Sequence, residues 1–113
     1  MALDPHRLAE ARSLAAHRVI AERLTRSPEL LDMARARVEG WLRESSSIRP
    51  HGKIWAEAWR ELLAGEPGAV ARAIVDDSER GRALRQSTPF AGALDPRERW
   101  RLWARVREEF EER

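Results

Sequence analysis

The stretch LRQSTPFAG, residues 84–92, sets the limit of the helical pattern in the C-terminal half of this sequence. Pro89 disfavours helical backbone angles at Thr88, so the helix that precedes the stretch has to end there. Gly92 tolerates a positive φ that other residues adopt with difficulty. Phe90 is the only large apolar side chain between these two points. The sequence therefore predicts a restrained corner between two helices.

This corner has two interpretations, which are compatible with each other. In the structural one, Phe90 fills the core beneath the last helix, and Arg85 and Gln86 bind backbone carbonyls freed at the end of the fifth helix. In the functional one, polar side chains around a rigid turn form a recognition surface, while Phe90 anchors the turn from inside. The predicted partner-binding residues are Arg82, Arg85, Gln86, Ser87, Thr88, Pro89 and Phe90.

Outside the corner, the sequence marks the starts of three helices with an N-cap residue followed by proline. The pairs are Asp4-Pro5, Ser27-Pro28 and Asp95-Pro96. The side-chain oxygen of the first residue can accept a backbone N–H that has no helical partner, and proline loses no hydrogen bond at the first helical position. We therefore expect helices to begin near residues 5, 28 and 96.

Apolar residues at helical spacing predict further helices at about 53–64 and from Pro67 onward, with SSSIRPHG at 45–52 as a loop. A fifth helix over ERGRALRQ at 79–86 is predicted with either Asp77 or Ser78 as its cap. No segment shows the strict alternation that is typical of a half-buried strand. The sequence thus predicts an all-α, compact bundle of five to six helices that forms a single domain over residues 1–113. Two apolar stripes include an aromatic pair each, and we expect both stripes to lie in the core, with a protein-binding anchor as the alternative. They are Ile54, Trp55, Ala58, Trp59, Leu62 and Leu63, and Trp100, Trp103, Val106 and Phe110.

The composition excludes several classes of function. Hydrophobic residues make up 42% and charged residues 35% of the chain, which is typical of a globular protein. The absence of cysteine excludes disulfides, thiolate zinc sites and thiol nucleophiles. No run of about 18 apolar residues and no signal-peptide pattern occurs, so we expect a cytoplasmic protein without a membrane partner.

Candidate catalytic and metal-binding patterns are weak. His6, His17 and His51 are the only histidines, and no two of them are spaced i, i+4. We expect all three to lie on the surface or to cap helices. The sequence contains no nucleophile-elbow, Walker or dinucleotide-binding pattern. We therefore predict no metal, no cofactor and no enzymatic activity.

Nucleic-acid binding is a further interpretation. The helix at about 53–64, the turn AGEPG and the helix AVARAIV have the lengths of a helix-turn-helix. Only Arg72 in the second of these helices could contact bases, and recognition helices present several polar side chains. The net charge of +2 is also small for a protein that neutralises several phosphates.

The C-terminal half, WRELLAG…RALRQSTPFAGALDPRERW, resembles a group of short bacterial helical proteins that share an Arg-Gln-Ser-x-Pro-Phe-Ala-Gly corner. The earlier stretch HRVIAERLTRSPELLDMARARVEGWL is similar to the same group. The resemblance implies an antitoxin-like or accessory partner, a protein-binding module that neutralises a cognate toxin by direct complex formation. The alternative is a small DNA-binding regulator of its own operon. Formation of homo-oligomers is compatible with either function. The residues that match the motif are Arg85, Gln86, Ser87, Pro89, Phe90 and Gly92.

Overall fold

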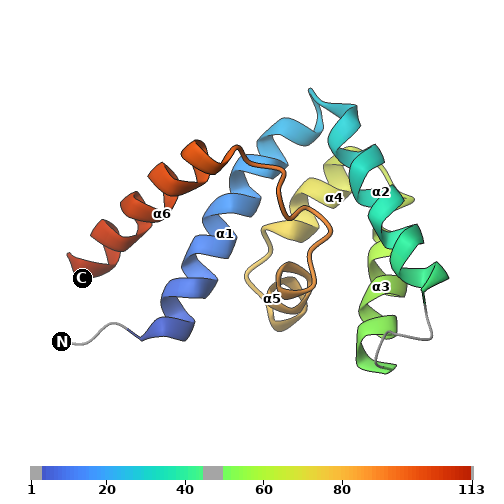
Figure 1. The fold of residues 1–113 in the computed structure, drawn as a ribbon, viewed down its shortest axis with the longest axis horizontal. Coiled ribbons are helices and arrows are strands. Elements are labelled where there is room, and N and C mark those ends of the chain that lie inside the picture. The colour runs from blue at the N-terminus through green and yellow to red at the C-terminus, as the bar shows by residue number, and fades with distance from the viewer. Residues whose placement is uncertain (1–3, 45–49, 113) are drawn as a thin grey trace.

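The computed structural model describes residues 4–44 and 50–112, which form six α-helices and no strand (Figure 1). The all-α bundle predicted from the sequence is therefore confirmed. None of the described helices combines the length and the apolar composition that a membrane span requires. The helices are α1 (Pro5–Leu24), α2 (Pro28–Arg43), α3 (Pro50–Leu63), α4 (Pro67–Ile74), α5 (Glu79–Gln86) and α6 (Pro96–Glu111).

The three helices predicted from a cap residue and a proline begin where the sequence places them. Asp4 accepts a hydrogen bond from the His6 backbone N–H at 3.0 Å, and Asp95 accepts one from the Arg97 N–H at 2.8 Å. Ser27, in contrast, makes no side-chain capping bond. α2 therefore starts at its proline without the expected serine cap. The predicted loop at 45–52 is shorter, because α3 already begins at Pro50, and its residues 45–49 lie outside the described residues.

α1 is the central helix of the bundle. It packs against α6 on one side and against α4 and α5 on the other, while α2 and α3 pair with each other at the far end (Figure 1). α6 packs chiefly on α1 and lies at the edge of the molecule. Residues 87–95, which include the second part of the corner, connect α5 to α6 and cross α1 on the way (Figure 1).

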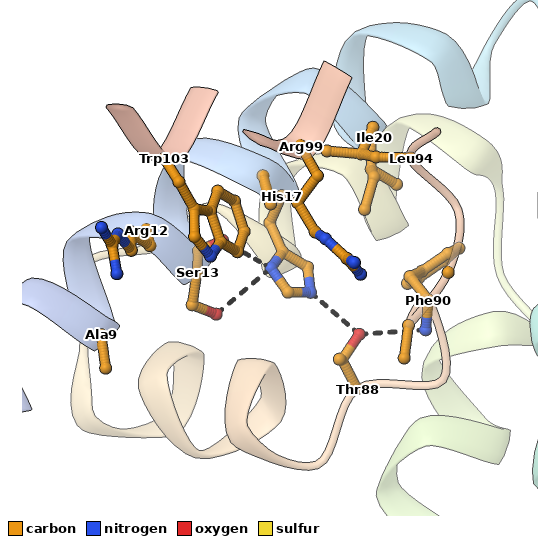
Figure 2. A pocket seen from close by; sticks show the side chains of 13 residues that line it. Ala9, Arg12, Ser13, His17, Ile20, Thr88, Phe90, Leu94, Arg99 and Trp103 are labelled. Carbon is orange, nitrogen blue, oxygen red and sulfur yellow. Dashed lines mark hydrogen bonds between the residues drawn. The ribbon is translucent and has the colours of Figure 1, made fainter. Parts of the chain in front are cut away.

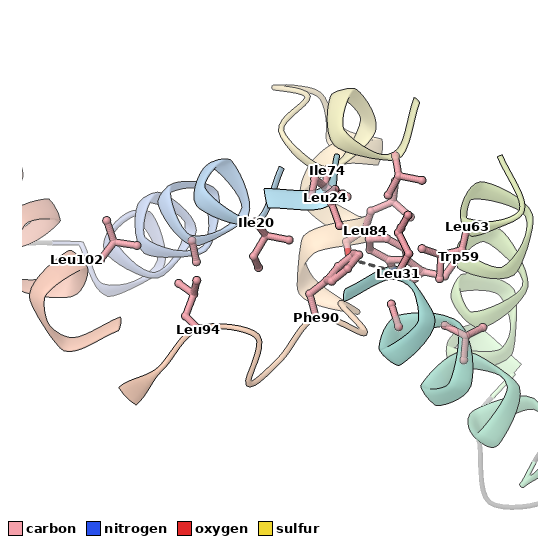
Figure 3. Packing of buried hydrophobic residues seen from close by; sticks show 14 residues of the cluster. Ile20, Leu24, Leu31, Trp59, Leu63, Ile74, Leu84, Phe90, Leu94 and Leu102 are labelled. Carbon is pink, nitrogen blue, oxygen red and sulfur yellow. Dashed lines mark hydrogen bonds between the residues drawn. The ribbon is translucent and has the colours of Figure 1, made fainter. Parts of the chain in front are cut away.

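The core lies where the C-terminal half of α1 meets α2 to α5 (Figure 3). Trp59 of α3 is fully buried at its centre, and Phe90 packs edge-on against it, with ring centroids 5.8 Å apart and an interplanar angle of 73°. Such a T-shaped pair adds about 0.5–1.5 kcal/mol beyond the burial of its area. The aliphatic residues around this pair include Leu24, Leu31, Leu63, Val70, Ile74 and Leu84.

Two of the expected core residues lie on the surface. Trp100 of α6 is 74% exposed and Ile54 of α3 is 61% exposed, so their assignment to the core was wrong. The reason in α6 is that the helix has α1 as its main neighbour, which covers only a narrow face. Leu102 and Val106 are the residues of α6 buried on that face.

Candidate functional site: the corner and the α1–α6 pocket

Arg85 lies inside the fold rather than on a recognition surface. Its side chain is 5% exposed, and its Nη1 donates to the carbonyl oxygens of Ile74 at 3.2 Å and Asp76 at 2.9 Å. These carbonyls belong to the last residue of α4 and to the turn that follows it, whereas the sequence predicted acceptors at the end of α5. Arg85 thus ties α5 to the preceding helix. Gln86, which was expected to act in the same way, is exposed.

The hydroxyl of Ser87 closes the end of α5. It donates to the Ala83 carbonyl at 3.0 Å, and it accepts a hydrogen bond from the indole Nε1–H of Trp59 at 3.1 Å. The same indole N–H lies 3.2 Å from the Leu84 carbonyl. A buried tryptophan needs a partner for its N–H, and the corner supplies it.

Thr88 connects the corner to α1 through His17. The Nδ1 of His17 lies 2.7 Å from the carbonyl oxygen of Ser13, which can only accept, so Nδ1 carries the proton. Nε2 then accepts from the Thr88 hydroxyl at 2.9 Å, and the hydroxyl oxygen accepts from the Phe90 N–H at 3.1 Å. Burial lowers the pKa of His17 and so favours the neutral ring, which this series of hydrogen bonds requires. The expectation that His17 lies on the surface or caps a helix was wrong.

α2 holds the second half of the corner. Arg37 donates to the carbonyl oxygens of Pro89, at 3.1 Å, and Ala91. Pro89 and Phe90 are buried, and Gly92 has the positive φ of 84° that the sequence predicted. Phe90 lies in the core as expected, although it packs on Trp59 of α3 and not beneath the last helix.

The predicted partner-binding residues therefore divide into two groups. Arg82 is partly exposed, with an ion pair to Asp77 at 3.3 Å, and Gln86 is exposed. The others are bonded or packed within the fold, where they fix the shape of the corner; they are Arg85, Ser87, Thr88, Pro89 and Phe90. Contact of any of them with a partner stays a prediction.

A pocket of about 380 Å³ lies between α1, α6 and the corner (Figure 2). We refer to it as the α1–α6 pocket. Its apolar wall consists of Ala9, Ala16, Ile20, Phe90, Leu94 and Trp103. Its polar wall consists of Arg12, Ser13, His17, Thr88 and Arg99. The corner thus forms one side of the α1–α6 pocket, which its residues Thr88 and Phe90 line.

The α1–α6 pocket carries positive charge without a compensating acid. No carboxylate lines it, and within the described residues neither Arg12 nor Arg99 has a side-chain hydrogen bond or an ion pair. The Nε of Arg12 is buried and lacks an acceptor there. One signal was visible in the sequence, since the positions one turn before and after Arg12 are Leu and Ala and offer no acid. Arg12 and Arg99 line the same pocket only through the tertiary packing of α1 and α6, which was not predicted.

The outer face of α6 is a second distinctive surface. Trp100 is exposed on it, and Arg97, Ala104 and Arg107 follow the same side of the helix at spacings of three and four residues. Residues 96–107 contain five arginines and one acid, Glu98. Glu98 already pairs with Arg23 of α1 through two hydrogen bonds of 2.8 and 2.5 Å. The first three turns of α6 therefore present an excess of positive charge around a tryptophan.

The predicted helix-turn-helix corresponds to α3 and α4, and α4 packs against α1. Val70 and Ile74 of α4 are completely buried, and Arg72 is the only charged residue of this helix. A recognition helix requires several polar side chains facing the groove. DNA binding through these helices stays a prediction that no contact in the structure favours.

No family model matches the chain, and no curated protein or solved structure matches it significantly. The resemblance of the corner motif to antitoxin-like proteins accordingly stays an expectation, and the function has to be argued from the surfaces described above.

Proposed function

We propose that this chain is a protein-binding module that acts in the cytoplasm as an antitoxin-like protein, neutralising a cognate toxin by direct complex formation. The observation that supports the proposal most is Trp100, whose side chain is 74% exposed on the outer face of α6. A single exposed apolar residue is common on protein surfaces, but Trp100 has the largest type of side chain and is flanked by arginines. Tryptophan and arginine are the residues most enriched at interface hot spots.

The charge of α6 indicates the kind of surface that it fits. Arg97 has no acidic partner among the described residues, and Arg107 pairs only with Glu111 on its own helix, at 3.2 Å in an exposed position. Exposed pairs of this kind contribute little and can exchange partners. We infer that the toxin offers an acidic surface with an apolar hollow that receives the indole of Trp100.

Binding assays between this chain and the protein encoded by the neighbouring gene test the proposal. We expect the pair to co-elute, and co-expression to relieve the growth arrest that the neighbour causes alone. Trp100→Ala should weaken binding by about 30-fold or more, because truncating a hot-spot residue costs at least about 2 kcal/mol. Ile54→Ala is the matched control, since Ile54 is also a large exposed apolar side chain but lies on α3.

Other outcomes separate the alternatives. A complex that forms equally well with Trp100→Ala and Ile54→Ala would show that the interface lies elsewhere. If no complex forms, and the chain instead shifts its own upstream DNA with an affinity that falls steeply with salt, it is a regulator and not an antitoxin-like protein. Arg97→Gln should reduce that salt dependence if the arginines of α6 contact phosphates.

A further inference from the structure

We propose that the α1–α6 pocket binds a small organic acid, a carboxylate carried on an aromatic or branched aliphatic body. This inference goes beyond the proposed function and does not depend on it, because the pocket and the outer face of α6 are different surfaces. Arg99 and Trp103 face the pocket, whereas Trp100 points to solvent. The pocket could therefore be occupied whether or not a protein is bound to α6.

The apolar body of the ligand follows from the size and the lining of the pocket. Its volume of about 380 Å³ falls in the range of roughly 300–1,000 Å³ that is usual for small-molecule sites. Trp103 of α6 is half-buried and contributes aromatic surface, while Phe90 and Ile20, which are 2% and 3% exposed, form the inner end of the apolar wall (Figure 2). A mostly apolar wall with a few polar groups is the usual composition of such sites.

The carboxylate follows from Arg99. Figure 2 shows the Arg99 side chain extending from α6 toward the His17 ring, and Arg12 lines the pocket from α1. Neither guanidinium has an acceptor among the described residues, and in Figure 2 the two lie on opposite sides of Trp103, so Arg99 is the one that extends beside His17. A planar guanidinium fork matches a planar carboxylate, so one ligand carboxylate can bind the guanidinium of Arg99, for which the described residues supply no acceptor.

The rest of the polar wall favours a single small anionic group. His17 is engaged at both ring nitrogens, by Ser13 and by Thr88, and Thr88 also receives the Phe90 N–H. These groups therefore already have hydrogen-bond partners within the fold, and Arg99 is left to bind the charged group of the ligand. Among the described residues that line the pocket, no acidic side chain attracts a cation or repels a carboxylate.

Titration of the full chain with 3-phenylpropanoate tests the assignment, with the uncharged 3-phenylpropanamide and with acetate as matched probes. Calorimetry gives the affinity, and the indole N–H resonance of Trp103, assigned with Trp103→Phe, reports the location. We expect the acid to bind at least about tenfold more tightly than either probe, since one lacks the charge and the other lacks the apolar body. The Trp103 resonance should shift with the acid, while that of the fully buried Trp59 should not.

Three variants complete the test. Arg99→Gln should weaken binding of the acid by about tenfold or more, whereas Arg105→Gln, an exposed arginine of the same helix outside the pocket, should leave it unchanged. Ala9→Phe should block the pocket from the exposed surface of α1 without changing the core. A thermal midpoint equal to that of the parent chain confirms that each variant is folded.

Several results would overturn the assignment. They are equal binding of acid and amide, equal binding by Arg99→Gln and Arg105→Gln, or no binding of the acid at millimolar concentration. A peptide that ends in phenylalanine tests the other source of the same chemistry. Tighter binding of this peptide than of 3-phenylpropanoate would assign the pocket to the end of a protein chain, and the small-acid assignment would be wrong.

Discussion

Replacing Thr88 with valine tests whether a hydrogen-bond chain from Phe90 through Thr88 to His17 holds the corner in place. Valine has nearly the shape of threonine but no hydroxyl, so the Phe90 N–H and His17 Nε2 both lose their partner, at 3.1 and 2.9 Å. His17 is only 3% exposed, which limits the access of water to its ring. An unsatisfied buried group costs about 1–3 kcal/mol, and we expect Thr88→Val to lower the free energy of unfolding by about 2–4 kcal/mol.

Urea unfolding monitored by circular dichroism measures this loss. With a slope of about 1–3 kcal/mol per molar urea for a domain of this size, the midpoint should fall by roughly 1–2 M. Thr25→Val is the control, because Thr25 is exposed at the end of α1, and surface changes usually stay within about 0.5 kcal/mol. If Thr88→Val and Thr25→Val unfold at the same urea concentration, the hydrogen-bond chain does not stabilise the corner and the reasoning is refuted.

Three further changes should alter the urea midpoint in the same assay. Gly81→Ala should destabilise by about 1–3 kcal/mol, although alanine is the better helix former, because its Cβ would lie 2.1 Å from the Asp76 carbonyl oxygen. Arg85→Met should cost about 1–3 kcal/mol, since the carbonyls of Ile74 and Asp76 lose their donor. Acidification should destabilise the protein through His17. Burial lowers the pKa of His17 in the folded protein below 6.5, so the unfolded chain binds the proton more tightly. The contribution of the neutral ring to stability is therefore fully present above pH 6.5 and is lost as the pH falls below it. His17→Gln should flatten this dependence between about pH 7.5 and 5.5.

The opposite results would be equally clear. A rise in stability with Gly81→Ala would mean that α5 shifts away from the end of α4 at little cost. An unchanged midpoint for Arg85→Met would mean that water reaches the two carbonyls. A pH dependence as steep in His17→Gln as in the parent chain would assign the effect to other groups.

The sequence predicted the features that depend on local chemistry. A cap residue and a proline place the start of α1 and α6, and the proline alone places that of α2, because both act within one turn of the helix. Pro89 and Gly92 predicted the corner for the same reason, because Pro89 restricts the backbone of Thr88 and Gly92 permits a positive φ. Even the helix α5 at 79–86 has the predicted limits.

The buried faces depended on neighbours that the sequence does not name. Helical spacing grouped Trp100 with Trp103 and Ile54 with Trp55, but the number of helices around α6 and α3 decides which of them is covered. Trp100 is exposed because α1 covers a different face of α6. Periodicity could not distinguish these cases, since both faces of α6 contain apolar residues.

The candidate site was the least predictable part. His17 is a single histidine between alanine and arginine in the sequence, and only the return of the corner onto α1 makes it a partner of Thr88. Arg12 and Arg99 likewise line one pocket because α1 and α6 pack together. The polar residues of the corner looked available for recognition, but whether Ser87 and Thr88 bond inward depends on the positions of Trp59 and His17.

The packing of α6 on α1 has a consequence for protein synthesis. Arg23 and Glu98, which join the two helices, are 75 positions apart, so the ribosome delivers one partner long before the other. Throughout the translation of α2 to α5, the side of α1 that includes Val19 stays uncovered and accessible to chaperones and proteases. A nascent chain that stalls before α6 would therefore expose on α1 the surface that α6 covers in the complete fold.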